Sequence, residues 1–440
     1  MKLDPASLVL SGPHSFLVLR HGKAVWSALS SGTNSYEELL DLAATEATSG
    51  TEIAEIVHLL RCAEGRRLVE YNLVTRGKIV AKLAPAQALT MEINGVDTSA
   101  TWVASRFTVI ERCGDGLAAE NPRHGHLLTI LDPRLAGTLA RACCRGGPLV
   151  GDQMEITLLR MAVAAGVLID QAGILEEATP PLAYWETADL RLAVNSRSGA
   201  HHHAVGARFP WLGVTEPEPA LKSPDPSRHH IQLPPADPLP AMSLSEAIAR
   251  RTSTASRQAG GQFKLETLST FLWHSARVTS ELSRDDSRGL HYDVARRTYP
   301  GGGAAYELEL YITSVDCEGL AAGTYWYDPK AHVFELRSSK DVFTNAIADT
   351  AMRSGALRHR PQVVLLITSR MSRLAWKYQG ISLALTLKNT GVLLQQFYLV
   401  ATALGLPSCA LGAGDTPLIN LATGTHLIDE APVGEFILGT

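Results

Sequence analysis

The sequence predicts an α+β protein with two small related units before a larger C-terminal domain. Three observations support this prediction: the chain has 440 residues, helical and strand-like patterns are interspersed along it, and residues 210–240 contain nine of its 23 prolines. A chain of this length exceeds one ordinary hydrophobic core. Clustered prolines are typical of an extended segment at a domain boundary.

The composition is that of a globular protein with a mildly acidic balance. Hydrophobic residues make up 45% and charged residues 19% of the chain, and the formal charge is −4. Because no overall basic excess is present, we do not expect nucleic-acid binding. The longest apolar stretch, 380–406, contains Lys388 and Asn389, which favours a buried helix over a membrane span.

The cysteines and the N-terminus predict a cytoplasmic location. The six cysteines show no CxxC spacing, so neither a disulfide framework nor a zinc site is expected. Asp4 and Pro5 interrupt the N-terminal segment, which makes it a poor signal peptide.

Residues 1–100, the first of the two small N-terminal segments, are predicted to be winged-helix-like. A hairpin is expected at 15–26, where apolar residues flank a His-Gly turn. An amphipathic helix at 51–63 and a strand–turn–strand at 68–83 follow. A helix followed by a β-hairpin is the order of a winged helix.

Residues 101–180, the second small N-terminal segment, are predicted to be a second winged-helix-like unit with a similar pattern. A hairpin is predicted at 105–120 around Gly114-Asp115-Gly116, whose residue types suit a turn with positive φ. Asp132-Pro133 is a helix start that predicts a helix to about Cys143, and a second helix is expected at 152–168.

Residues 181–240 are predicted to connect these units to a C-terminal domain at 241–440. In that domain we expect one helix that begins at about Leu244 and two more at 264–277 and 380–404. Strands are expected at 306–314, 324–328, 362–369 and 407–413.

Three short motifs of the C-terminal domain suit a phosphate-bearing or flat ligand. In SEAIARRTSTASR, 245–257, arginine forks and small hydroxyl groups follow a helix, although basic residues there also simply complement the helix dipole. In PGGGAAYELE, 300–309, three glycines allow close backbone approach, but they also fit an ordinary loop before a strand. CALGAGD, 409–415, is another small-residue stretch after a long helix.

The fourth motif, LAWKYQGISLAL at 374–385, places Lys377 and Tyr378 where the chain enters a hydrophobic helix. Lysine and tyrosine both titrate near pH 10 in solution, so a base role at neutral pH would require an environment that lowers the pKa, as burial does for lysine and an adjacent ammonium does for tyrosine. The alternative is that Lys377 extends its ammonium group to solvent while Tyr378 packs.

The order of these four motifs resembles the azoline dehydrogenases of the nitroreductase superfamily, flavin-dependent enzymes of ribosomal peptide biosynthesis. The resemblance covers 241–440 strongly and YWETADLRLAVNSRSGAHH, 184–202, more weakly. Gly301 stands where this family has serine, and Glu307 where it has proline. The resemblance implies an FMN-binding nitroreductase fold in 241–440, a homodimer with FMN between the subunits, an azoline-containing precursor peptide as substrate and a cyclodehydratase as partner.

The same resemblance implies the site residues. Lys377 and Tyr378 would be the catalytic proton-transfer pair, and we leave open which of them takes the proton. The cofactor-binding residues would be Arg250, Arg251, Ser253, Arg297, Pro300, Gly301, Gly302, Gly303, Ala304, Gly412, Ala413 and Gly414. Two alternatives are kept: an NAD(P)H-dependent nitro- or quinone reductase, and a flavin-less docking subunit of a biosynthetic complex.

No metal site is predicted. The histidine runs His201-His202-His203 and His229-His230 invite a metal-binding interpretation. Consecutive histidines cannot all face one ion, however, and no carboxylate is spaced regularly with them.

Overall fold

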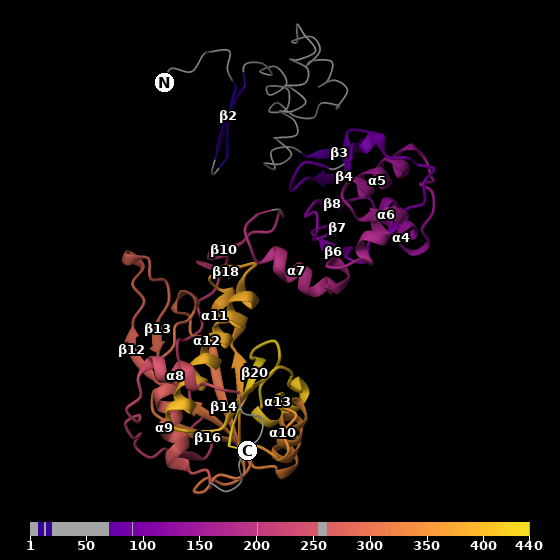
Figure 1. Cartoon of the computed structure of the whole chain (residues 1–440). Coiled ribbons are helices and arrows are strands. Elements are labelled where there is room, and N and C mark those ends of the chain that lie inside the picture. The colour runs from indigo at the N-terminus through magenta and orange to yellow at the C-terminus, as the bar shows by residue number, and fades with distance from the viewer. Residues whose placement is uncertain are drawn as a thin grey trace. The chain divides into compact units, whose positions relative to one another are not determined.

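The computed structural model describes residues 8–12, 15–19, 70–89, 91–199, 201–253 and 262–439. The chain divides into two compact units, Met1–Ala204 and Val205–Thr440 (Figure 1). The predicted helix at 51–63 and the predicted His-Gly turn lie outside the described residues.

The first unit is built around a five-stranded antiparallel sheet in the order β3-β4-β8-β7-β6. Its strands are β3 (Tyr71–Thr75), β4 (Lys78–Ala84), β6 (Val109–Cys113), β7 (Gly116–Glu120) and β8 (Leu127–Ile130). Short pairs are formed by β1 (Leu8–Gly12) with β2 (Ser15–Leu19) and by β5 (Val103–Ala104) with β9 (Leu168–Ile169). Among the described residues of this unit, the α-helices are α4 (Pro133–Arg145), α5 (Gln153–Ala164), α6 (Gln171–Glu177) and α7 (Thr187–Asn195).

Local sequence signals account for the elements of this unit. The predicted hairpins at 68–83 and 105–120 are present as β3–β4 and β6–β7. Asp132 caps α4 by accepting a hydrogen bond from Arg134 N–H, with Pro133 at the first helical position. Because β4 pairs with β8, strands from both predicted N-terminal units join one sheet. Winged-helix character stays a prediction.

The second unit contains a seven-stranded antiparallel sheet in the order β11-β16-β15-β14-β17-β20-β19. These strands are β11 (His230–Gln232), β14 (Leu308–Ser314), β15 (Gly323–Asp328), β16 (Val333–Ser338), β17 (Val363–Ser369), β19 (Ser408–Leu411) and β20 (Ala431–Leu438). Two short pairs flank it, β10 (Gly206–Ala207) with β18 (Tyr378–Gln379) and β12 (Val278–Leu282) with β13 (Val294–Arg297). The helices are α8 (Leu244–Arg250), α9 (Leu265–Ala276), α10 (Asp341–Ser354), α11 (Met371–Ala375), α12 (Ser382–Ala403) and α13 (Thr416–Thr423).

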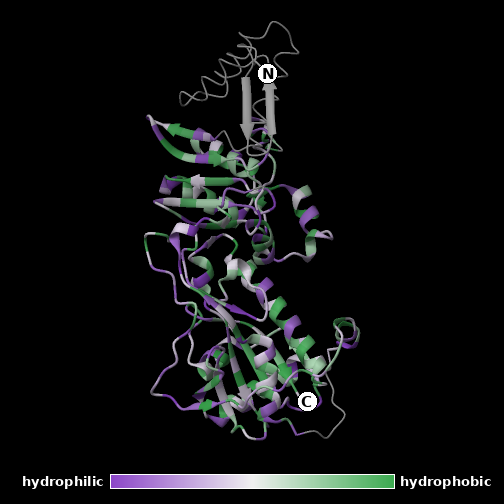
Figure 2. Ribbon diagram, turned by 90° about the vertical axis from the view of Figure 1, so that its left-hand side faces the viewer, coloured by the Kyte–Doolittle hydropathy of each residue, from purple (hydrophilic) through white to green (hydrophobic). Residues whose placement is uncertain are grey.

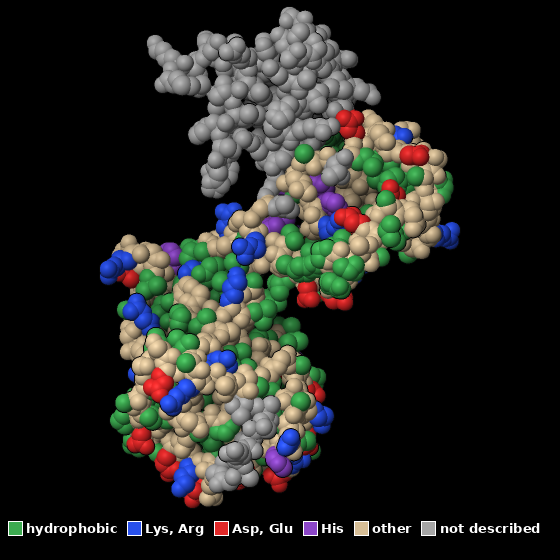
Figure 3. Space-filling view, viewed as in Figure 1, with side chains coloured by type: hydrophobic (Ala, Val, Ile, Leu, Met, Phe, Trp, Pro, Cys, Tyr) green, Lys and Arg blue, Asp and Glu red, His purple; other side chains and the backbone are tan. Residues whose placement is uncertain are grey.

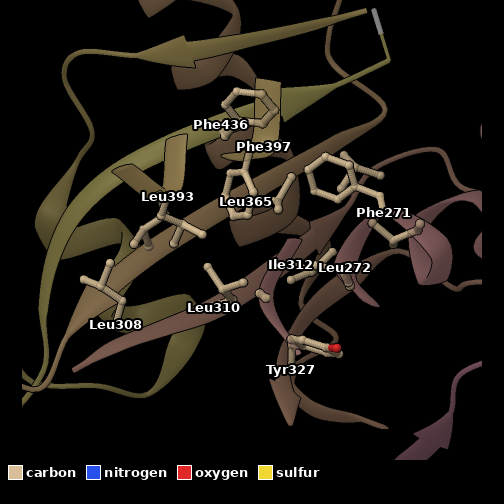
Figure 4. Close-up of a cluster of buried hydrophobic side chains, with 14 of the residues drawn as sticks. Phe271, Leu272, Leu308, Leu310, Ile312, Tyr327, Leu365, Leu393, Phe397 and Phe436 are labelled. Carbon is tan, nitrogen blue, oxygen red and sulfur yellow. The ribbon is translucent and has the colours of Figure 1, made fainter. Parts of the chain in front are cut away.

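The central strands of this sheet are buried on both faces. Every residue of β14 and β17 is buried, and alternate side chains enter different cores. On one face, Leu310 and Ile312 pack with Phe397 of α12 and Phe271 of α9 (Figure 4). On the other, Tyr311 joins a core with residues of α10 and α13. Figure 2 shows hydrophobic and hydrophilic residues interspersed along the helices and strands of the chain.

The proline-rich stretch packs along the second unit. Within it, β11 adds to the sheet edge by pairing with β16. Lys222 Nζ donates to Glu430 Oε2 at 2.6 Å and to the Tyr311 hydroxyl at 2.5 Å. We call residues 205–240 the strap, because these contacts hold it against the sheet. The mixed helix and strand architecture predicted from sequence is therefore confirmed.

Candidate functional site

Lys377 and Tyr378 lie in an irregular connection between α11 and α12. Lys377 precedes the short strand β18, and Gly380 has φ +71° before α12 begins. Lys377 Nζ is 5.2 Å from the centre of the Tyr378 ring. Both side chains are half-buried. The two neighbouring side chains thus converge, because the chain here is a two-residue bridge followed by a turn rather than a regular strand.

Residues 300–304, which we call the glycine loop, lie directly against this pair. Gly303 has φ +61°, a left-handed conformation that glycine adopts without strain. A Cβ atom at this position would collide with the Tyr378 hydroxyl and lie 2.7 Å from Lys377 Nζ. Any side chain here would therefore displace the lysine–tyrosine pair.

A third residue, Tyr292, joins the pair to the loop. Its hydroxyl accepts a hydrogen bond from Lys377 Nζ at 2.7 Å and donates one to the carbonyl oxygen of Gly303. Tyr292 is 6% exposed, and its ring meets Trp376 edge to face with centroids 6.2 Å apart. Burial raises the pKa of Tyr292, with the nearby Arg373 guanidinium opposing this shift, so the phenol keeps its proton for Gly303.

The glycine loop is also anchored to α12. Gly302 N–H donates to Asn389 Oδ1 at 2.9 Å, and Asn389 Nδ2 donates to Glu307 Oε1 at 2.9 Å. Glu307 is fully buried, and its Oε2 has no hydrogen-bond partner among the described residues. Burial raises the pKa of Glu307 despite the hydrogen bond from Asn389.

Arg297 lies beside this loop. Its Nη1 donates to the Ala295 carbonyl at 2.7 Å, and its guanidinium is 5.9 Å from the centre of the Tyr306 ring. A Cβ on Gly301 would lie 3.3 Å from the same ring. Pro300 and Ala304 bound the loop, whose last three residues form one 3₁₀ turn.

The arginine–serine motif forms a second cluster, around Tyr398 of α12. Ser253 Oγ lies 2.9 Å from the Tyr398 hydroxyl, which also accepts a hydrogen bond from Ala410 N–H at 2.8 Å. The Arg251 guanidinium is 5.4 Å from the centre of the same ring. Arg250 is more exposed and forms an ion pair with Glu246 at 2.7 Å.

Gly412, Ala413 and Gly414 follow β19 and are exposed. The Ala413 carbonyl accepts a hydrogen bond from Ser354 Oγ at 2.9 Å. A Cβ on Gly414 would collide with the carboxylate of Glu435, which is 7% exposed. Burial raises the pKa of Glu435 to about 7.

The structure therefore gathers the predicted residues of the glycine loop and of the arginine–serine motif into two clusters along α12, and it leaves Gly412–Gly414 apart from both, against Ser354 of α10 and Glu435 of β20. Gly302 contacts Asn389 and Ser253 contacts Tyr398, and these helical residues are nine positions apart, which is about 13 Å along the axis. Tyr292, Asn389 and Tyr398 were missed by the sequence analysis. Their partners are distant in the chain, as in the 85-residue separation of Lys377 and Tyr292, so no local pattern marks them.

The predicted absence of metal and membrane sites can be compared with the described residues. Among them, no group of three or more His, Cys, Asp and Glu side chains is arranged to hold a metal ion. His203 instead lies 2.8 Å from Glu120. No helix in the described part of the chain has the length and apolar character to cross a membrane. Figure 3 shows basic and acidic side chains interspersed over the face in view.

Residues 262–440 match the Nitroreductase family, so the C-terminal half carries a nitroreductase-family domain. Members of this family are generally flavin oxidoreductases. A protein of Methanocaldococcus jannaschii named as a nitroreductase is 28% identical over 183 residues, which are 42% of this chain and 83% of that protein.

Three solved structures are similar at lower identity. A nitroreductase from Ralstonia eutropha is 22% identical, covers 51% of this chain and 94% of its own, and has a TM-score of 0.37. A chain of the E. coli microcin synthetase McbBCD complex with truncated pro-MccB17 bound is 19% identical. The match covers 49% of this chain and 79% of that chain, with a TM-score of 0.36. A nitroreductase from Anabaena variabilis is 15% identical, covers 91% of each chain and has a TM-score of 0.41.

Proposed function

We propose that this chain is an FMN-dependent azoline dehydrogenase that oxidises thiazolines or oxazolines of a ribosomally made precursor peptide to thiazoles or oxazoles. The observation that carries the proposal is the convergence of Lys377 and Tyr378 on Gly303, with Tyr292 holding the lysine. A nitroreductase-family domain needs no lysine–tyrosine pair for flavin binding alone. The pair is the feature that a proton-abstracting oxidation requires.

The residues present fit FMN. Arg250, Arg251 and Ser253 offer two guanidinium groups and a hydroxyl, the donor set that suits a phosphate and a ribityl chain. The backbone of 300–304 and of 412–414 would flank the flavin ring, and Gly303 and 412–414 are exposed. When bound, FMN would supply the hydride acceptor for a two-electron oxidation.

The protein's own residues supply the proton acceptor. Converting an azoline to an azole removes a hydride from one ring carbon and a proton from the carbon next to the carbonyl. Lys377 Nζ, as the neutral amine, or the Tyr378 oxygen, as the phenolate, would take that proton, since both lie against Gly303 of the glycine loop. Tyr292 keeps the lysine directed toward Gly303 through its two hydrogen bonds.

The predicted homodimer is supported by an apolar surface on two adjacent helices. α8 contacts α12, and both carry exposed apolar side chains. The exposed fractions are 67% for Leu244, 58% for Ile248, 45% for Leu383, 46% for Leu387 and 38% for Val392. A second copy covering this surface would also come close to the cluster of Ser253, which follows α8, and Tyr398 of α12. We also propose that a cyclodehydratase, which would form the azoline rings, is a partner of this chain.

The test is oxidation of an azoline peptide by the purified, FMN-loaded full chain. We expect a loss of two mass units per ring under air. Lys377→Ala and Tyr378→Phe are each expected to keep FMN and lose most turnover, because a positioned base contributes about 10²- to 10⁴-fold. Normal rates in both variants would remove the pair from the mechanism. Rapid reduction of the flavin by NADPH, without azoline oxidation, would favour a nitro- or quinone reductase.

A further inference from the structure

A cavity of about 340 Å³ lies in the second unit, outside the clusters described so far. Three segments line it: residues 212–216 of the strap, residues 284–291 between β12 and β13, and Trp376. This volume is near the lower end of ligand pockets, roughly 300–1,000 Å³, and suits a short piece of chain better than a second large cofactor.

The cavity adjoins the lysine–tyrosine pair. Trp376, part of its wall, directly precedes Lys377. The Phe209 ring meets the rings of His291 and Trp376, with centroids 5.2 and 6.0 Å away. Lys377 Nζ lies 5.7 Å from the centre of the same Phe209 ring. A peptide whose ring reaches Lys377 would therefore have its neighbouring residues at this cavity.

The polar side of the cavity is a small charge network. Arg284 Nε is 2.8 Å from Asp286, and its Nη1 is 2.8 Å from Glu216. His291 Nδ1 lies 2.8 Å from the same aspartate. The hydrogen bonds from His291 and Arg284 lower the pKa of Asp286, so this carboxylate stays charged. Two carboxylates face one guanidinium, which disfavours an anionic ligand.

The other side is apolar and held in place. The Trp376 indole N–H donates to the Thr215 carbonyl at 2.8 Å, which ties the strap to the wall of the cavity. Leu212, also in the lining, is 42% exposed. Arg284 uses two of its five N–H donors on the carboxylates, so others can reach a peptide carbonyl. An apolar wall with a few polar groups suits a neutral or basic stretch of peptide.

We propose that this cavity binds the uncharged or basic peptide segment that flanks the reacting azoline. The inference rests on the proposed function and adds to it a site that selects the residues beside the ring. The ring itself would lie at Lys377 and Tyr378.

The experiment uses the FMN-loaded full chain and two thiazoline substrates. One is bare 2-methylthiazoline-4-carboxamide, and the other carries the same ring between glycine residues. We expect the extended substrate to have a KM about tenfold lower, the effect of roughly one hydrogen bond to a charged group. Arg284→Ala should abolish most of this advantage. Arg288→Ala, which changes a neighbouring arginine outside the lining, should retain it.

Binding of the oxidised products provides a readout that does not depend on turnover. Calorimetry should show tighter binding of the glycine-flanked thiazole than of the bare thiazole, with Arg284→Ala reducing the difference. Replacing the flanking glycines by glutamates should weaken binding, and Glu216→Gln should relieve part of that penalty.

The outcomes separate two failures. If the unchanged chain oxidises neither thiazoline, the proposed function fails and this inference fails with it. If it oxidises both with equal KM, or if Arg284→Ala and Arg288→Ala behave alike, only the cavity assignment is overturned.

Discussion

Replacing Tyr292 by phenylalanine removes the hydroxyl that connects Lys377 to the glycine loop and keeps the ring. The ring contact with Trp376 should persist, because phenylalanine has the same shape. Two hydrogen bonds are lost, one from Lys377 Nζ at 2.7 Å and one to the Gly303 carbonyl. Each of these hydrogen bonds contributes about 0.5–1.5 kcal/mol, so the pair contributes about 1–3 kcal/mol.

That free energy translates into a rate. At about 1.4 kcal/mol per factor of ten, kcat for azoline oxidation should fall about fivefold to a hundredfold. KM for the bare thiazoline should change much less, because Tyr292 orients the base. FMN content, measured by flavin absorbance after purification, should be kept.

Tyr325→Phe is the matched control. Tyr325 is 2% exposed and donates one hydrogen bond to the Ala321 carbonyl at 2.9 Å, in the same unit. It should lose comparable stability and keep its kcat. Equal kcat values for Tyr292→Phe and the unchanged chain would refute the positioning role, and so would equal losses in both variants.

Three further predictions concern the cofactor cluster, a buried carboxyl and the loop anchor. Arg251→Ala should weaken FMN binding about tenfold in a fluorescence titration, since it removes a charged donor; unchanged affinity would contradict the phosphate assignment. Glu435 has a pKa of about 7 in the fold against an ordinary value of 4.5. Below about pH 4.5 the proton is bound in both the folded and the unfolded state. Between about pH 4.5 and 7 only the unfolded state releases it, so the free energy of unfolding falls by about 3 kcal/mol over that range. Glu435→Gln should therefore gain in melting temperature over the unchanged chain across that range, and a constant difference would argue against it. Asn389→Leu should lower the stability of the second unit by about 2–5 kcal/mol in urea, because it removes two buried hydrogen bonds. Gln395→Leu, an exposed change on the same helix, should not.

Local patterns predicted the elements well where a cap, a turn or a periodicity marks them. Asp132-Pro133 marked the start of α4, and Gly114–Gly116 the turn between β6 and β7. The long apolar segment predicted a helix at 380–404, and α12 spans Ser382–Ala403. These signals act over a few residues, so they survive without knowledge of the fold.

The strap shows where such reasoning ends. Clustered prolines indicate an extended chain, which is correct for most of it. They do not indicate that β11 pairs with β16 or that Lys222 reaches Glu430, which lies 208 residues away. Contacts of this kind depend on which sheet edge and which buried carboxylate the fold brings near.

The sequence by itself determined the α+β class, the nitroreductase-like C-terminal domain and the motif that holds Lys377 and Tyr378. Short-range propensity and motif order were sufficient for these. The tertiary structure alone decided that the pair converges on Gly303, that Tyr292 holds the lysine, and that Asn389 joins the glycine loop to a buried Glu307. The physical reason is that hydrogen bonds between residues far apart in the chain leave no periodic trace in it. They form only once packing of the sheet and α12 has excluded water and placed the partners within reach.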